Sequence, residues 1–122
     1  MTTILIVDDN PDIRELFSTF LNIAGFSTMA VGGGAECIEL LKTTRPDLIL
    51  LDIMMEPMDG WQTLKLIKSQ PENRDIPVFM VTGKAITETE QQMYNGDFKI
   101  YLMKPVTPQR LKDAVDGILK SR

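Results

Sequence analysis

Residues 4–11 of the chain read ILIVDDNP, and this stretch decides the fold. Four consecutive aliphatic residues are typical of a strand that is buried on both faces of a sheet. Asn10 followed by Pro11 is typical of a helix start, because asparagine caps the first turn and proline needs no hydrogen-bond partner there. A buried strand that leads directly into a helix predicts a βα unit of a parallel sheet.

The same unit recurs along the rest of the chain. Four further apolar runs alternate with helical patterns, and they lie at residues 27–31, 48–51, 78–81 and 100–103. The helical pattern after the fourth run, over residues 85–95, has few apolar residues, but Thr87 with Glu90 three positions later predicts a capping box. Five strands that alternate with five helices predict a parallel sheet with helices on both faces.

The polarity of each run predicts its place in the sheet. The first, third and fourth runs are uniformly apolar, whereas the second contains Ser27 and Thr28 and the fifth opens after Lys99. Central strands of a parallel sheet are buried on both faces, so we expect the two more polar runs at the edges. The strand order 2-1-3-4-5 satisfies this condition, and it is the order of the flavodoxin-like doubly wound α/β fold. We therefore expect one (βα)5 domain over residues 1–122, with no room for an effector domain.

Composition narrows the class of protein. The chain has 122 residues, 43% of them hydrophobic, enough for one ordinary domain. Its net charge is −4, whereas a nucleic-acid binder is expected to have a basic surface. No run approaches the roughly 20 apolar residues of a membrane span, so we expect no membrane association. A single cysteine, Cys37, allows no internal disulfide and favours a cytoplasmic location. The absence of histidine excludes Ser-His and Cys-His catalysis and histidine-bound metals.

Polar residues stand at the end of four of the five apolar runs. Asp8 and Asp9 follow the first run, Asp52 the third, Thr82 the fourth and Lys104 the fifth. Doubly wound sheets bind ligands beyond the carboxyl ends of their strands, beside the point where the strand order reverses. We therefore expect these side chains to meet at one end of the sheet.

This set of side chains predicts phosphoryl chemistry. Like charges ~4 Å apart repel by ~4 kcal/mol at an effective dielectric constant of ~20, so three clustered carboxylates predict a bound cation. Oxygen ligands with room for water and phosphate favour Mg²⁺. A carboxylate such as Asp52 can attack phosphorus without a general base, while Thr82 and Lys104 can bind the phosphoryl oxygens.

The strand-end motifs resemble those of the receiver domains of two-component response regulators. Each is short, but together they occur in order, one at a strand end or in the loop that follows it, over residues 3–119. They read VDDN at 7–10, LDIMM at 51–55, MDG at 58–60, VT at 81–82 and YLMKP at 101–105. The resemblance implies that Asp52 is the phosphoacceptor and that Asp8, Asp9, Asp52 and the backbone carbonyl of Met54 hold Mg²⁺.

The resemblance also implies a way of signalling. Thr82 and Lys104 would contact the phosphoryl group, and Tyr101 would turn inward when Thr82 moves. A histidine kinase or histidine phosphotransfer protein would be the donor, facing the first helix and residues 10–12. An unknown target protein would meet the fourth helix and fifth strand. The chain would act as a single-domain, chemotaxis-regulator-like signalling protein, a monomer or weak dimer, and would catalyse only its own phosphorylation and dephosphorylation.

Other functions remain open at this stage. The same fold could serve as a non-phosphorylated interaction module, although a complete acid, threonine and lysine set argues against it. A flavin carrier is disfavoured because Asp8 and Asp9 would repel its phosphate, and an aspartyl phosphatase because Met54 stands where its second aspartate is needed. The glycines at 32–34 lack the spacing of a phosphate cradle and favour a turn. The side chain of Met54 is predicted to overhang the pocket and slow hydrolysis.

Overall fold

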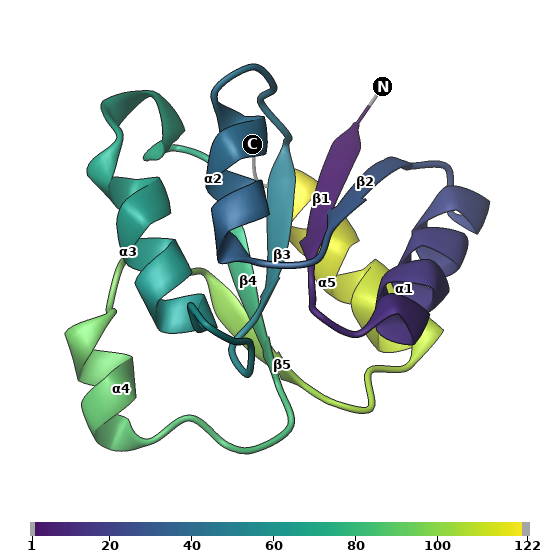
Figure 1. Ribbon diagram of the computed structural model, residues 1–122. Helices are drawn as coiled ribbons and strands as arrows, with labels where there is room; N and C mark the ends of the chain where they lie inside the picture. Colours follow the sequence, from purple (N-terminus) through teal and green to yellow (C-terminus); the bar gives the residue numbers. More distant parts are fainter. Residues whose placement is uncertain (1, 121–122) are drawn as a thin grey trace.

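The computed structural model describes residues 2–120 and consists of a parallel five-stranded sheet between two layers of helices (Figure 1). The strands are β1 (Thr3–Val7), β2 (Ser27–Val31), β3 (Leu48–Asp52), β4 (Val78–Thr82) and β5 (Ile100–Met103). The helices are α1 (Pro11–Ile23), α2 (Gly34–Leu41), α3 (Gly60–Ser69), the 3₁₀ helix η1 (Pro71–Asn73), α4 (Glu88–Met93) and α5 (Pro108–Lys120). None of the helices within residues 2–120 has the length and apolar character that crossing a membrane requires.

The strand order is β2-β1-β3-β4-β5, which confirms the order predicted from strand polarity. Every neighbouring pair is parallel, and the pairing brings the carboxyl ends level with one another. Val7 pairs with Leu51, Asp52 with Val81, and Thr82 with Met103. The segments that follow β1, β3, β4 and β5 therefore emerge side by side at one end of the sheet.

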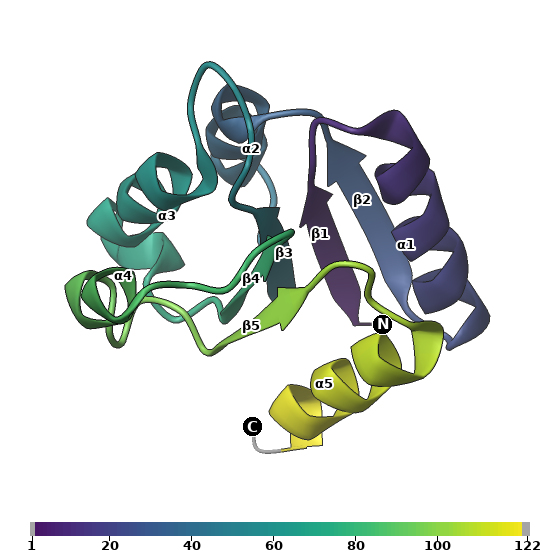
Figure 2. The same cartoon turned by 90° about the horizontal axis from the view of Figure 1, so that it is seen from below.

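Two apolar clusters hold the helices against the sheet, one on each face. Alternate strand residues such as Leu5 and Ile49 pack toward α2 and α3, while their neighbours Ile4 and Leu50 pack toward α1 and α5. Figure 2 shows this division, with α1 and α5 on one side of the sheet and α2, α3 and α4 on the other. Cys37 lies in the first cluster as a buried small side chain, and burial raises the pKa of its thiol to about 12.

Helix caps fix where the loops around the strand ends begin. The side chain of Asn10 accepts a hydrogen bond from the Asp12 amide at the start of α1. Gly25 follows the end of α1 with φ +99°, a conformation that favours glycine. Thr107 accepts from the Arg110 amide at the start of α5. The cap at Asn10 confirms the predicted start of the first helix.

The fourth helix is shorter than the pattern over residues 85–95 predicted. α4 spans Glu88–Met93, because the Thr87–Glu90 capping box starts the helix only after Thr87. None of its six residues, all of them described, is buried. Met93, an apolar residue of this helix, is 65% exposed. Ile86 and Tyr94, which flank the helix, do pack against the α2–α3 cluster.

Candidate functional site

Three carboxylates meet at the carboxyl ends of the two central strands. Asp8 follows β1, Asp9 comes next, and Asp52 closes β3. One oxygen from each lies within 4.8 Å of the other two. Asp8 and Asp52 are almost fully buried, whereas Asp9 is exposed, so the cluster opens to solvent on the Asp9 side.

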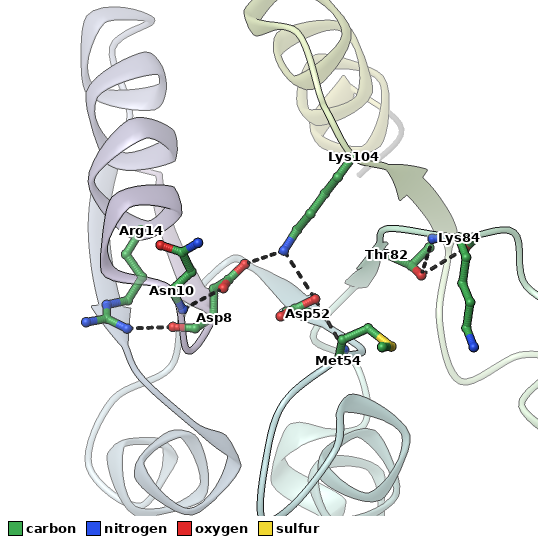
Figure 3. Close-up of polar contacts among 8 residues, drawn as sticks. All are labelled: Asp8, Asn10, Arg14, Asp52, Met54, Thr82, Lys84 and Lys104. Atoms are coloured by element: carbon green, nitrogen blue, oxygen red, sulfur yellow. Dashed lines mark hydrogen bonds and ion pairs between the residues drawn. The ribbon is translucent and has the colours of Figure 1, made fainter.

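Lys104 lies between the two buried carboxylates (Figure 3). It follows β5, and its Nζ lies 3.0 Å from Asp8 Oδ2 and 3.4 Å from Asp52 Oδ1. Burial acts to lower the pKa of Lys104, but the hydrogen bond to Asp8 and the charges of both carboxylates raise it above its ordinary value. The ammonium therefore stays charged and offsets part of the negative charge of the cluster.

Asp52 has an electrostatic environment unlike that of an ordinary surface carboxylate. Burial and the neighbouring charge of Asp8 raise the pKa of Asp52 to about 6, although Lys104 and a hydrogen bond from the Met54 amide act in the opposite direction. That amide lies 3.3 Å from Asp52 Oδ1. Lys104 therefore does not fully compensate the negative charge of the ionised Asp52 carboxylate. A further cation at this position would stabilise the ionised form.

The fit of Mg²⁺ to these side chains can be judged from the donor set. The side chains of the cluster offer three carboxylates, of which that of Asp9 is exposed and those of Asp8 and Asp52 are buried. Hard oxygen donors on an open site suit Mg²⁺, which keeps several waters and binds a few protein carboxylates. The residues present therefore fit this ion.

Asp8 is held by hydrogen bonds at both its backbone and its side chain. Its Oδ1 accepts from the Asn10 amide at 2.9 Å, and its own amide donates to the Val31 carbonyl at 3.2 Å. Its carbonyl accepts from Arg14 Nη1 at 2.7 Å (Figure 3). Sequence reasoning missed Arg14, since nothing in its helical position indicates that it turns back toward the strand end.

The first residue of α3 makes a close contact with the backbone of Asp52. Gly60, the first residue of α3, donates its amide to the Ile53 carbonyl at 2.9 Å. A Cβ added at Gly60 would lie 2.3 Å from the Asp52 carbonyl oxygen, closer than any real side chain approaches. The helix can therefore pack against the phosphoacceptor candidate only because residue 60 is a glycine.

Thr82 lies at the end of β4 but its hydroxyl does not contact the carboxylates. Its Oγ1 donates to the Lys84 carbonyl at 2.8 Å and accepts from the Lys84 amide at 3.2 Å. Figure 3 shows the threonine apart from Asp52, on the side of the site away from Asp8. The parallel strands bring Thr82 to the predicted end of the sheet, and the local turn at Lys84 decides where its hydroxyl points.

A cavity of about 430 Å³ lies beside the carboxylates. It is lined by Asp9, Ile53, Met54, Met55, Glu56, Asp59, Trp61, Lys84 and Glu90. Met54 is 58% exposed and lines this cavity, in agreement with its predicted place at the pocket. The cavity gives the cluster an open approach from solvent on the side of α4.

Trp61 connects α3 to α4, a contact that the sequence did not reveal. Its indole Nε1 donates to Glu90 Oε2 at 2.8 Å, and its ring stacks on Tyr94 with centroids 4.3 Å apart. Hydrogen bonds donated by the Thr87 amide and by the Trp61 indole lower the pKa of Glu90. The only sequence signal was that Trp61 is the single tryptophan of the chain.

Tyr101 lies in the middle of β5 and is half-buried. It packs at the margin of the α2–α3 cluster, which also includes Phe98 and Trp61. It pairs with Met80 of the neighbouring strand. Its position is thus on the α4 side of the sheet, at the edge strand nearest to that helix (Figure 2).

Comparison with known proteins gives a consistent result. A family model described as the response regulator receiver domain matches residues 4–116. The polar-differentiation response regulator DivK of Brucella anthropi is 32% identical over 117 residues, which cover 96% of this chain and 95% of that protein. The N-terminal domain of a response regulator receiver protein from Methanoculleus marisnigri JR1 is 47% identical, with a TM-score of 0.83 and coverage of 100% of this chain and 99% of that one.

A second similar structure is the receiver domain of the sensor histidine kinase PA1611 from Pseudomonas aeruginosa PAO1. It is 24% identical, has a TM-score of 0.85, and covers 95% of each chain. That structure has a magnesium ion coordinated in its active site cleft. At this identity the comparison shows the shared fold.

Proposed function

This chain belongs to the response regulator receiver domain family, and we propose that it accepts a phosphoryl group on Asp52 and changes conformation to signal to a partner protein. Receiver domains are signalling domains that take phosphoryl groups from histidine kinases and act on downstream partners. The observation that carries the proposal is the position of Asp52, a buried carboxylate beside Asp8, Asp9 and Lys104 at the carboxyl end of the sheet.

In the proposed reaction, a carboxylate oxygen of Asp52 attacks the phosphorus of a phosphohistidine. The O–P bond forms, the N–P bond breaks, and its electron pair returns to the imidazole of the donor. The donor histidine must belong to another molecule, because this chain contains none. A histidine kinase or a histidine phosphotransfer protein is the proposed partner, and the reaction is the only chemistry we assign to the domain, apart from hydrolysis of its own acyl phosphate.

Each polar residue has a separate proposed role. Asp8, Asp9, Asp52 and the carbonyl of Met54 would hold Mg²⁺, which supplies positive charge where the transferring phosphoryl group carries negative charge. Lys104 adds a second positive charge that is already in place beside Asp52. The magnesium ion of the Pseudomonas aeruginosa receiver domain supports this assignment.

The response to phosphorylation is proposed to start at Thr82. Its hydroxyl would leave the Lys84 backbone groups and turn to a phosphoryl oxygen, so that residues 83–87 shift and α4 with them. Tyr101 would then change its packing beside α4. An element without a buried residue is displaced at low cost, so a coupling of ~1–3 kcal/mol suffices. The target protein would read this surface, and we place the domain in the cytoplasm as a monomer or weak dimer.

The test of the phosphoacceptor is the mass of the intact protein after incubation with acetyl phosphate. We expect a labile adduct of one phosphoryl group that requires Mg²⁺ and is absent from Asp52→Asn. Asp113→Asn is the matched control, since Asp113 is an exposed aspartate on α5, and it should be labelled as the wild type is. An adduct that persists in Asp52→Asn would overturn the assignment.

If the wild type forms no adduct, binding of beryllium fluoride separates two cases. Binding that requires Mg²⁺ and Asp52 would mean that the domain is selective for a protein donor. No binding would mean that the domain is a non-phosphorylated interaction module.

The proposed response can be tested separately by amide hydrogen exchange with and without beryllium fluoride. We expect altered exchange in residues 83–94 and in β5, and little change in β2, which lies at the opposite edge of the sheet. Unchanged exchange around α4 would contradict the proposed role of this helix.

A further inference from the structure

Arg14 forms a hydrogen bond with the backbone of Asp8, one of the three clustered carboxylates. It lies in the first part of α1, half-buried, and its Nη1 donates to the Asp8 carbonyl at 2.7 Å. Figure 3 shows the side chain reaching from the helix back to the end of β1. The amide of Asp8 is held at the same time by the Val31 carbonyl. Both polar groups of the Asp8 main chain therefore have fixed partners.

The guanidinium lies against Gly32. A Cβ added at Gly32 would lie 3.3 Å from Arg14 Nη1, which is tighter than an ordinary contact. Gly32 directly follows Val31, so the turn after β2 contacts the same side chain that binds Asp8. A side chain at residue 32 would therefore press on the guanidinium and displace it by a few tenths of an ångström.

The positive charge of Arg14 and its hydrogen bond to Asp8 have opposite effects on Mg²⁺ binding. A guanidinium near a cation site repels the cation, so its charge alone weakens Mg²⁺ binding. Its hydrogen bond has the opposite effect, because a carbonyl fixed at the strand end also fixes the carboxylates of Asp8 and Asp9, which come from the same stretch of backbone. The two effects predict opposite results when the residue is replaced.

We propose that Arg14, seated against Gly32, is a positioning residue that orders Asp8 and Asp9 for Mg²⁺. This inference rests on the proposed function, since it assumes that these carboxylates hold the ion. It adds to that function a residue that never touches the ion or the phosphoryl group. The arginine acts through its hydrogen bond to the Asp8 carbonyl.

The first experiment measures Mg²⁺ affinity by calorimetry at pH 8, with the free energy of unfolding measured in parallel. We expect Arg14→Met to weaken Mg²⁺ binding about tenfold, the lower end of the effect of outer-shell partners on metal sites. Arg110→Met is the matched control, because Arg110 is exposed on α5 and its loss changes the net charge equally. The control should bind Mg²⁺ as the wild type does.

Two further variants change the contact with the Asp8 carbonyl but keep a positive charge at residue 14. Gly32→Ala should weaken Mg²⁺ binding in the wild type but have little further effect in Arg14→Met, because both changes break the same contact. Gly117→Ala is the control for a glycine change, since a Cβ there meets nothing within 4 Å. Arg14→Lys should recover part of the lost affinity, as lysine can supply one donor to the carbonyl.

The outcomes separate this inference from the proposed function. Tighter or unchanged Mg²⁺ binding in Arg14→Met, with normal binding in the wild type, overturns the positioning role and leaves the proposed function in place. Lower stability without weaker Mg²⁺ binding means that the arginine is purely structural, which also overturns it. A wild type that binds no Mg²⁺ overturns both. Should Arg14→Met not fold, Gly32→Ala and Arg14→Lys decide the question by the same measurement.

Discussion

The two sides of the site are held in very different ways. On the acid side, at the ends of β1 and β3, Asp8 and Asp52 are buried, paired with Lys104 and fixed by backbone hydrogen bonds. On the threonine side, β4 leads into residues 83–87, which are mostly exposed, and into α4, which buries no residue of its own. The side chain of Trp61 makes the ring stacking and indole hydrogen bond that join this helix to α3.

This difference fits two separate tasks, the phosphoryl-transfer reaction on the acid side and the conformational signal on the threonine side. A reaction that depends on position requires groups whose geometry does not change, and the acid side has them. A signal requires an element whose position can change for a few kcal/mol, and the helix held by few contacts satisfies this condition. The following predictions test whether the contrast is as large as the contacts indicate.

The largest expected effect is a loss of stability on replacing Gly60 of the acid side, compared with the same change at Gly83 of the threonine side. Gly60→Ala places a Cβ 2.3 Å from the Asp52 carbonyl oxygen and 2.6 Å from Ile53 Cα, so we expect a loss of about 3 kcal/mol or more in the free energy of unfolding. Gly83→Ala meets nothing within 4 Å and should change it by less than about 1 kcal/mol. Urea denaturation followed by circular dichroism measures both. Similar midpoints for the two variants would contradict the contrast.

The next effect concerns the charge buried on the acid side. Because the pKa of Asp52 is raised to about 6 in the folded protein, the folded state binds its proton more tightly than the unfolded state does. The contribution of Asp52 to stability is thus complete below pH ~4 and is lost as the pH rises through 6. Without Mg²⁺, we expect Asp52→Asn to be more stable than the wild type by about 2–3 kcal/mol at pH 8.

The pH dependence supplies the control for this measurement. The advantage of Asp52→Asn should vanish near pH 4, where the wild-type carboxyl is also neutral, and should shrink at pH 8 when Mg²⁺ stabilises the wild type. Urea unfolding at the two pH values measures it. An advantage that is equally large at pH 4 would mean that the effect is not electrostatic.

A smaller effect is expected where Glu90 joins α4 to Trp61. The carboxylate accepts from both the Thr87 amide and the indole, whereas a glutamine has one carbonyl oxygen for the two donors. Loss of one such bond costs about 0.5–1 kcal/mol, so Glu90→Gln should speed amide exchange in residues 88–94 by roughly two- to fivefold. Exchange in β1 should not change. Glu88→Gln, on the same helix, is the control, and an equal effect there would assign the change to net charge.

The smallest effect should be that of Met54 on the lifetime of the phosphorylated state. Its exposed side chain lies at the cavity beside the carboxylates, so Met54→Ala should admit water more easily and speed dephosphorylation by a small factor. The decay of the labelled protein measures the rate. Met93→Ala is the control, because this methionine of α4 is also exposed but does not line the cavity. An unchanged rate in Met54→Ala would refute the shielding role.

The sequence predicted those features that depend on local pattern and strand polarity. The strand order followed from the polarity of the second and fifth runs, and the meeting of Asp8, Asp52 and Lys104 followed from parallel strands whose carboxyl ends share one edge. The capping box at Thr87 was visible as two residues three positions apart. These are regularities of backbone geometry, which every residue of an element shares.

The features that the sequence did not predict are individual side-chain contacts across the fold. Arg14 turns back to the Asp8 carbonyl, and Trp61 reaches Glu90 from another helix. Periodicity shows which face of a helix is buried but not which atom a long side chain reaches. The direction of the Thr82 hydroxyl likewise depends on the turn at Lys84, which no repeating pattern encodes.

The contact of Trp61 with α4 has a consequence for how the protein can be observed. Trp61 is the only tryptophan of the chain, so its tryptophan fluorescence comes from one ring. That ring is stacked on Tyr94 and donates a hydrogen bond to Glu90. Both residues belong to residues 83–94, the segment proposed to move on phosphorylation. The native chain therefore carries its own optical reporter, placed where α4 meets the rest of the molecule.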